Sequence, residues 1–283
     1  MQRYPASWGL LLGLWLFLAG LAPVHAQTSG PHFYFVQISD THFGSPWEDE
    51  TAQAFVEAIN ALPMPIECVV HTGDVFADRI GKPSVLAVGT STLARLKAPL
   101  HVVAGNHDIL TNDTEQVAGI FTNAFGALSG RAEHQGVSFI WAYTEPLRGY
   151  IHVPGYDPLK AVEKLLAEAG DKPVIILTHS PGVEDFHNNA IFPGWPEKAR
   201  RQWEALISRP NVKAVITGHF HRDELHWMGN IPVFVGEPSA SYWGRQPAFR
   251  IYEYKDGRLG YRTVYKEPKK RVSKEAPKAT DVP

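Results

Sequence analysis

Apolar residues gather in short runs, separated by longer segments in which they recur at helical spacing. The runs are rich in β-branched and aromatic residues, which favour strands, and several are apolar throughout, as in strands covered on both faces. The predicted strands are Phe33–Ile38, Cys68–Val70, Leu100–Val103, Val137–Tyr143, Val174–Leu177, Val212–Ile216 and Ile231–Val235, followed by a hairpin within Phe249–Tyr265.

Three of the intervening segments repeat apolar residues every three or four positions and are predicted helices: Phe55–Leu62, Leu159–Leu166 and Pro196–Ser208. Asp157 followed by Pro158 is a predicted helix start, with an N-cap side chain and proline at the first helical position. Strands and helices that alternate in this way predict an α/β layered domain, which we place at residues 27–265.

The first 26 residues have the layout of a secretory signal peptide. Arg3 is followed by an apolar run from Trp8 to Leu21, and Val24-His25-Ala26 offers a small-residue cleavage site after Ala26. An uncleaved anchor is the alternative, but Pro23 ends the run just before that site. We therefore expect a periplasmic or secreted protein without a stable membrane anchor.

Charge and composition narrow the range of partners. The formal net charge of −2 gives no basic field for a nucleic-acid duplex. Cys68 is the only cysteine, so the chain forms no internal disulfide. Residues 266–283 are rich in Lys and Pro with few apolar side chains, which predicts a flexible tail.

Five short polar motifs follow five of the predicted strands: Asp40-Thr41-His42, Gly73-Asp74, Gly105-Asn106-His107-Asp108, His179 and Gly218-His219-Phe220-His221. A single Asp or His after a strand is usually a turn or capping residue. Five such motifs can converge, because ligands of open α/β sheets bind beyond the carboxyl ends of the strands.

The residue types and spacings favour metal binding. In extended chain, residues two apart project to the same side, so Asp40 and His42 can face one ion, as can His219 and His221. The Asp74 carboxylate has two oxygens and can bridge two ions. Seven side chains exceed the four of a structural zinc site, and a dinuclear site accounts for the surplus.

The order D-x-H, G-D, G-N-H-D, H, G-H-x-H, from Asp40 to His221, resembles the calcineurin-like metallophosphoesterase superfamily. The resemblance implies a four-layer α/β sandwich of two mixed β-sheets flanked by helices. It also implies two divalent ions and a two-metal mechanism in which a metal-bridging hydroxide attacks phosphorus. Mn, Fe and Zn all suit these ligands.

The resemblance further implies a role for each matched residue. One ion would be held by Asp40, His42 and His221, and the other by Asn106, His179 and His219, with Asp74 bridging them. His107 would protonate the leaving oxygen, and Asn106 and His107 would contact the substrate. Asp108 either fixes the orientation of His107 or caps backbone N–H groups. His71 is expected in the core or behind the ligands.

Departures from the family pattern bear on the substrate. Ala77 stands where purple acid phosphatases have a tyrosine, and Ala104 and Asp108 stand where protein Ser/Thr phosphatases have Arg and Glu. Only 44 residues, 222–265, lie between His221 and the predicted tail, too few for the capping domain of the repair nucleases. The remaining resemblance is to compact bacterial phosphodiesterases that act on cyclic nucleotides or similar small diesters. A phosphate-scavenging monoesterase and a non-catalytic metal-binding protein are the alternatives.

Overall fold

A computed structural model describes residues 30–184, 194–241 and 244–266. The predicted signal peptide, residues 1–26, lies outside these ranges, as does the predicted tail apart from Lys266. Within the described ranges, no helix has the length and apolar character needed to cross a membrane.

The first part of the chain and its last hairpin form a mixed five-stranded sheet. β1, β2 and β3 are parallel, while β10 is antiparallel to both β1 and β11. The order across the sheet is β11 (Arg258–Tyr265), β10 (Ala248–Lys255), β1 (His32–Ile38), β2 (Ile66–His71) and β3 (Leu100–Val102).

The middle of the chain forms a mixed six-stranded sheet. β5, β6, β7 and β9 are parallel, and the antiparallel strands β4 and β8 lie at its two edges. The order is β4 (Ser129–His134), β5 (Val137–Ala142), β6 (Val174–Leu177), β7 (Val212–Thr217), β9 (Ile231–Val235) and β8 (Glu224–Met228).

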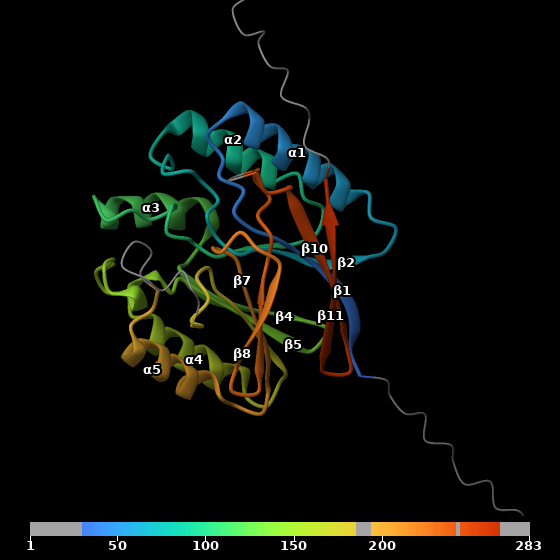
Figure 1. Cartoon of the computed structure of the whole chain (residues 1–283), viewed down its shortest axis with the longest axis vertical. Coiled ribbons are helices and arrows are strands. Elements are labelled where there is room, and N and C mark those ends of the chain that lie inside the picture. Colours follow the sequence, from blue (N-terminus) through green and yellow to red (C-terminus); the bar gives the residue numbers. More distant parts are fainter. Residues whose placement is uncertain (1–29, 185–193, 242–243, 267–283) are drawn as a thin grey trace, which may run out of the picture.

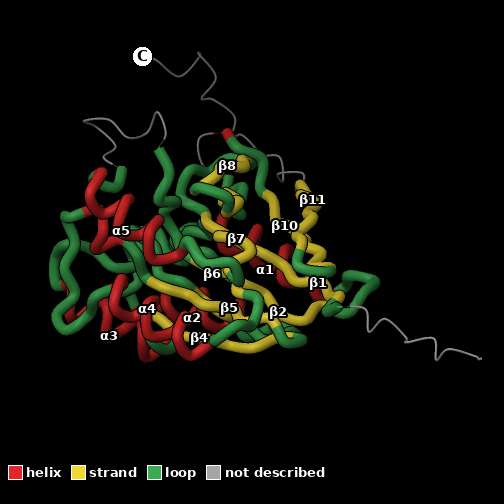
Figure 2. Tube along the Cα trace, turned by 90° about the horizontal axis from the view of Figure 1, so that it is seen from below, coloured by secondary structure: helices red, strands yellow, loops and turns green. Residues whose placement is uncertain are grey.

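Helices cover the outer face of each sheet, which gives four layers (Figure 1). The outer face of the five-stranded sheet packs against α1 (Pro46–Asn60), α2 (Pro83–Leu93) and α3 (Thr114–Phe125). The six-stranded sheet packs against α4 (Pro158–Ala169) and α5 (Glu197–Ile207), which lie beside its strands in Figure 2. A third apolar cluster, including Phe35, Phe139 and Tyr252, fills the space between the sheets. The α/β sandwich of two mixed sheets is confirmed.

The predicted strands and helices are present, and most ends shift little. The exception is the helix predicted over Phe55–Leu62, which is only the second half of α1, Pro46–Asn60. The helix predicted from Pro196 to Ser208 runs from Glu197 to Ile207. Asp157 caps α4 by accepting hydrogen bonds from the N–H groups of Leu159 and Lys160. Five further elements lie in segments where the apolar pattern predicted none: α2, α3, β4, β8 and the 3-10 helix Glu145–Arg148.

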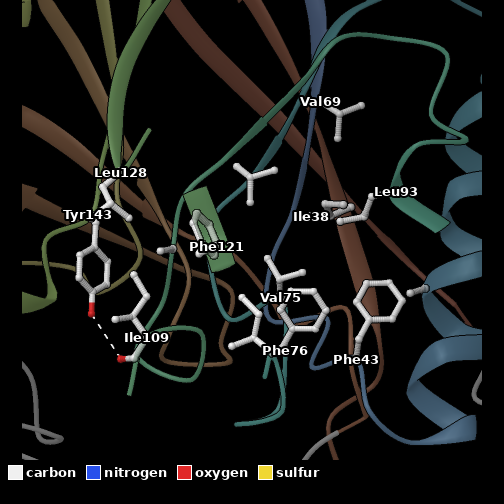
Figure 3. Packing of buried hydrophobic residues seen from close by; sticks show 14 of the residues in the cluster. Ile38, Phe43, Val69, Val75, Phe76, Leu93, Ile109, Phe121, Leu128 and Tyr143 are labelled. Carbon is white, nitrogen blue, oxygen red and sulfur yellow. Dashed lines mark hydrogen bonds between the residues drawn. The ribbon is translucent and has the colours of Figure 1, made fainter. Parts of the chain in front are cut away.

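Apolar side chains hold the loops after β2 and β3 against the core (Figure 3). Val75 and Phe76, from the loop after β2, are fully buried, as is Ile109 from the loop after β3. The Tyr143 hydroxyl donates to the Ile109 carbonyl oxygen at 3.5 Å. These contacts fix the backbone next to Asp74 and Asp108.

Candidate active site

The seven predicted ligands follow the carboxyl ends of strands from both sheets. The five-stranded sheet supplies Asp40 and His42 after β1, Asp74 after β2 and Asn106 after β3. The six-stranded sheet supplies the remaining three, namely His179 after β6 and His219 and His221 after β7.

Asp40, His42 and His221 form one group of buried side chains. Their ligand atoms lie within 4.8 Å of one another. Asp40 Oδ1 is 3.0 Å from His221 Nε2 and 4.0 Å from His42 Nε2, and the two Nε2 atoms are 3.4 Å apart. This is the group that the resemblance assigns to one ion.

Asp74, His179 and His219 form the second group, also within 4.8 Å. His179 Nε2 lies 3.1 Å from Asp74 Oδ2 and 3.1 Å from Asn106 Oδ1. Asp74 Oδ2 is also 3.9 Å from His42 Nε2, in the first group. Asp74 therefore lies between the two groups, where a bridging ligand belongs.

The pKa values of the candidate ligands bear on which of them are ready to bind a metal ion. Burial opposes ionisation of Asp40 and Asp74, but the neighbouring His221 and His179 outweigh it and hold the pKa of both carboxyl groups below the usual range. Burial lowers the pKa of His42 to about 4. Burial also opposes protonation of His179, but Asp74 outweighs it and raises the pKa of His179 to about 10, so a metal ion would displace a proton from this imidazole. Charged carboxylates and a neutral imidazole are the forms that bind metal ions.

Two observations show that these residues fit divalent ions. In the described part of the chain, the buried Asp40 Oδ1 atom faces only imidazole nitrogens that are themselves candidate ligands, with His221 Nε2 at 3.0 Å, so a cation among them would satisfy the carboxylate. The Nδ1 atom of His179 lies 2.7 Å from the Thr72 carbonyl oxygen, so it carries the proton and leaves Nε2 for a metal.

The ligand backbone contradicts the extended geometry that the two-residue spacing suggested. Asp40, His42, Asp74, His219 and His221 all have positive φ, between 49° and 71°. Non-glycine residues rarely adopt this conformation, and each such residue costs on the order of 1–3 kcal/mol. Asp40 and His42 therefore reach one group through left-handed turns after the strand end, not through alternation along a strand. His219 and His221 lie in different groups, so the expectation from their spacing that they face one ion is wrong.

His107 lies at the edge of this cluster with 39% of its side chain exposed. Its Nε2 atom is 4.0 Å from Asp74 Oδ2, and its ring packs edge-on against His42. Its Nδ1 atom is 2.8 Å from Asp78 Oδ1. Burial lowers the pKa of His107, but Asp74 and Asp78 outweigh burial and raise it, so the imidazolium form is favoured.

Asp78 is thus the residue that orients His107, and the orienting role considered for Asp108 is wrong. Asp108 is buried, and its carboxylate accepts hydrogen bonds from the N–H groups of Val75, Phe76 and Gly105, at 3.1, 2.8 and 2.8 Å. Both its oxygens are engaged by backbone donors because the loops after β2 and β3 meet there. Its position supports the capping alternative.

His71 lies behind the ligands. Its Nδ1 accepts from the N–H of Gly73 at 3.2 Å, so its Nε2 carries the proton and donates to the Thr41 hydroxyl at 2.9 Å. Burial lowers the pKa of His71 to about 3, which keeps it neutral. The prediction of a core or supporting histidine is confirmed.

Glu145 and Arg148, in a 3-10 helix (Glu145–Arg148), were not singled out by the sequence pattern. Glu145 is fully buried, and its Oε2 atom lies 2.9 Å from Arg148 Nη1. Their charges act on His219, whose pKa is lowered to about 3 by burial and by the charge of His179. No strand-end motif contains them, so only the fold places this ion pair beside the second group.

Sequence comparisons agree with this arrangement. The pattern of the calcineurin-like phosphoesterase family matches residues 33–223, a range that contains all seven candidate ligands. The mouse serine/threonine-protein phosphatase CPPED1 is 26% identical over 225 residues, 70% of this chain and 72% of that protein. The DNA double-strand break repair protein Mre11 of Thermoplasma acidophilum is 26% identical over 204 residues, 66% of this chain and 51% of that protein.

Solved structures share the fold. A dimetal phosphatase from Danio rerio superposes with a TM-score of 0.57 at 13% identity, covering 83% of this chain and 99% of that one. A purple acid phosphatase from yellow lupin gives a TM-score of 0.59 at 14% identity, covering 83% of this chain and 52% of that one. The family pattern, the shared fold and the two ligand groups agree, and the chain belongs to the calcineurin-like phosphoesterase family.

Proposed function

We propose that this protein is an exported phosphodiesterase that hydrolyses small phosphodiesters with two divalent metal ions. The observation that carries the proposal is the position of Asp74, whose Oδ2 atom lies 3.1 Å from His179 and 3.9 Å from His42 and so joins two ligand groups. Two bound ions would activate a water molecule and polarise the phosphoryl oxygens.

The residues around the ions supply proton transfer. The imidazolium of His107 keeps its Nδ1 proton on Asp78 and presents its Nε2 proton to the leaving oxygen. Its partial exposure suits this role, because the leaving alcohol must reach it from solvent. The buried ligands behind it need not change their protonation during the reaction.

Charge favours a diester over a monoester. Asp40 and Asp74 cancel two of the four charges of the ions, which leaves about two positive charges. A diester monoanion and a hydroxide nucleophile balance them, whereas a monoester dianion would need a further cation. The nearby Arg148 is already paired with the buried Glu145.

A phosphomonoesterase is the second candidate, and the name of the mouse relative, a serine/threonine-protein phosphatase, favours it.

Export is supported by the charged start, apolar run and small-residue site within residues 1–26. Mass spectrometry of the N-terminus after expression of the full chain tests export. A mature N-terminus at residue 27 is expected, and an intact Met1 would contradict it.

The activity is tested with metal-stripped protein given Mn²⁺, Zn²⁺ or Fe²⁺. We expect bis(p-nitrophenyl) phosphate to be hydrolysed with a higher kcat/KM than p-nitrophenyl phosphate. Asp74→Ala should abolish hydrolysis, whereas Asp171→Ala, at an exposed position before β6, should not change it. A higher kcat/KM for the monoester would favour the phosphatase. No hydrolysis of either substrate by protein holding two ions would indicate a non-catalytic protein.

A further inference from the structure

Cys68, His101 and His134 form a third group of possible ligands, and it shares no residue with the active site. Cys68 lies on β2 and His101 on β3, in one sheet, while His134 ends β4, in the other. β3 and β4 are edge strands of their sheets, so the group spans the space between the two sheets at one side of the sandwich.

The three ligand atoms already lie close together. The Nε2 atoms of His101 and His134 are 2.8 Å apart, and all three ligand atoms lie within 4.8 Å of one another. Tetrahedral zinc with bonds of about 2.0 Å to nitrogen and about 2.3 Å to sulfur separates its ligand atoms by roughly 3.3–3.6 Å. Small side-chain movements reach that geometry.

We propose that Cys68, His101 and His134 bind a zinc ion that links the two sheets. One thiolate and two imidazoles are ligands that zinc takes in proteins, and a water molecule would complete the tetrahedron. On zinc binding, the Cys68 thiol would release its proton to solvent, and the proton between the two imidazoles would move to Nδ1 of His101, so that both rings bind as neutral imidazoles.

Glu67 provides a second and independent sign of a metal site. Its Oε1 atom lies 3.4 Å from His134 Nδ1, and its Oε2 accepts from Gln135 Nε2 at 3.1 Å. A carboxylate on the far nitrogen of a metal-binding histidine is a common supporting contact, because it fixes the tautomer and orients the ring. Here it turns the Nε2 lone pair of His134 toward His101.

The surroundings restrict movement of the two rings. His101 stacks on Trp141, with ring centroids 5.2 Å apart and planes at 19°, and His134 packs edge-on against Phe139. Cys68 is fully buried. Burial and the charge of Glu67 raise the pKa of the Cys68 thiol, so the thiol stays protonated without a metal and zinc affinity should rise with pH.

Cobalt substitution gives a spectroscopic signal that is specific to this site. Thiolate-to-cobalt charge transfer absorbs in the near ultraviolet, the chain has a single cysteine, and the active-site ligands include no thiolate. Full-length protein stripped of metal and reloaded with Co²⁺ should show this band and bind about three ions per chain. Asp74→Ala should keep the band while losing active-site ions.

Substitutions at the group complete the test. Cys68→Ser should remove the band and one bound ion, and His134→Gln should weaken the band even if Cys68→Ser fails to fold. Glu67→Gln should lower Zn²⁺ affinity about 10-fold to 100-fold in competition with a chromophoric chelator. Absence of the band in folded, cobalt-saturated wild type would overturn the proposal, as would wild-type metal content in Cys68→Ser. Neither result bears on phosphodiester hydrolysis.

Discussion

At the scale of single residues, the chemistry depends on which partner each polar side chain finds. His107 and Asp108 are neighbours in the sequence, yet one faces Asp78 at the edge of the site and the other binds backbone N–H groups beneath it. Of the ligands behind them, Asn106 and His219 are partly buried and the other five are buried. His107 is the residue with both a proton to give and access to solvent.

Replacing His107 with Asn should lower kcat for substrates with poor leaving groups by about 10²–10⁴-fold, because proton donation to the leaving oxygen is lost. The loss should be much smaller for p-nitrophenyl esters, whose leaving group needs no proton. Steady-state kinetics across a series of leaving groups measures this difference, with metal content as the control. An equal loss across the series would contradict acid catalysis.

Asp78→Asn should move the alkaline limb of the pH–kcat profile to lower pH. Asp78 stabilises protonated His107 and so raises its pKa. A general acid works only while protonated, so its activity is lost as pH rises through that pKa. Asp256→Asn, a matched control in the exposed β10–β11 turn that also has positive φ, should leave the profile unchanged. An unshifted profile for Asp78→Asn would rule out this role.

The metal ligands and His107 could be predicted because each sits in a short motif after an apolar run. Asp78 and Glu145 could not, since an aspartate four residues beyond Asp74 and a glutamate in a separate segment carry no pattern of their own. For Asp108 the sequence allowed two roles. Contacts between loops, which the sequence does not encode locally, distinguish them.

At the scale of elements, the site is built by loops that pack tightly on one another. A Cβ atom at Gly105 would lie 2.1 Å from Asp74 Oδ1, and one at Gly218 would lie 2.5 Å from Asp40 Oδ2. Because Gly105 and Gly218 have no side chain, they leave room for the carboxylates of Asp74 and Asp40, which are candidate metal ligands. The sequence spacing shows the glycines, but not which side chain occupies the space beside each.

Gly105→Ala should displace Asp74, reduce metal content and lower kcat/KM by about 100-fold or more. Gly119→Ala is the control, because Gly119 lies within α3 and a Cβ there meets nothing within 4 Å. That change should stabilise the protein by about 0.5–1 kcal/mol with no effect on kcat/KM. Kinetics, metal analysis and thermal unfolding measure these effects. Wild-type metal content in Gly105→Ala would refute the packing argument.

The elements that the pattern did not predict lie at the periphery. β4 is mostly polar and β8 exposes Leu225 and Trp227, as edge strands with one neighbour each. α2 and α3 contain glycines and β-branched residues, which lower helix propensity, although the apolar residues of α3 do recur at helical spacing. The central strands were predictable because both of their faces are buried, whereas these elements depend on contacts with the rest of the fold.

At the scale of the whole molecule, the active site joins the two sheets. Each ligand group takes side chains from both, since Asp40 and His42 meet His221, and Asp74 meets His179 and His219. Bound ions should therefore stabilise the packing of one sheet on the other in addition to supporting catalysis.

Chelation should accordingly lower the melting temperature by roughly 5–10 °C, the effect of losing ligand present at about 100 times its Kd. Differential scanning calorimetry with and without chelator measures the change. The melting temperature of Asp74→Asn, which lacks the bridging charge, should fall much less when chelator is added. An equal response in wild type and variant would place the effect outside this site.

Ligand groups assembled from both sheets also set the order of events during folding. A chain with complete helices and strands but undocked sheets holds only fragments of each metal site. Metal binding and hydrolysis should therefore return late in refolding, after the far-ultraviolet circular dichroism signal has recovered. The recovery of hydrolysis during refolding would then measure the rate at which the two sheets finally pack against each other.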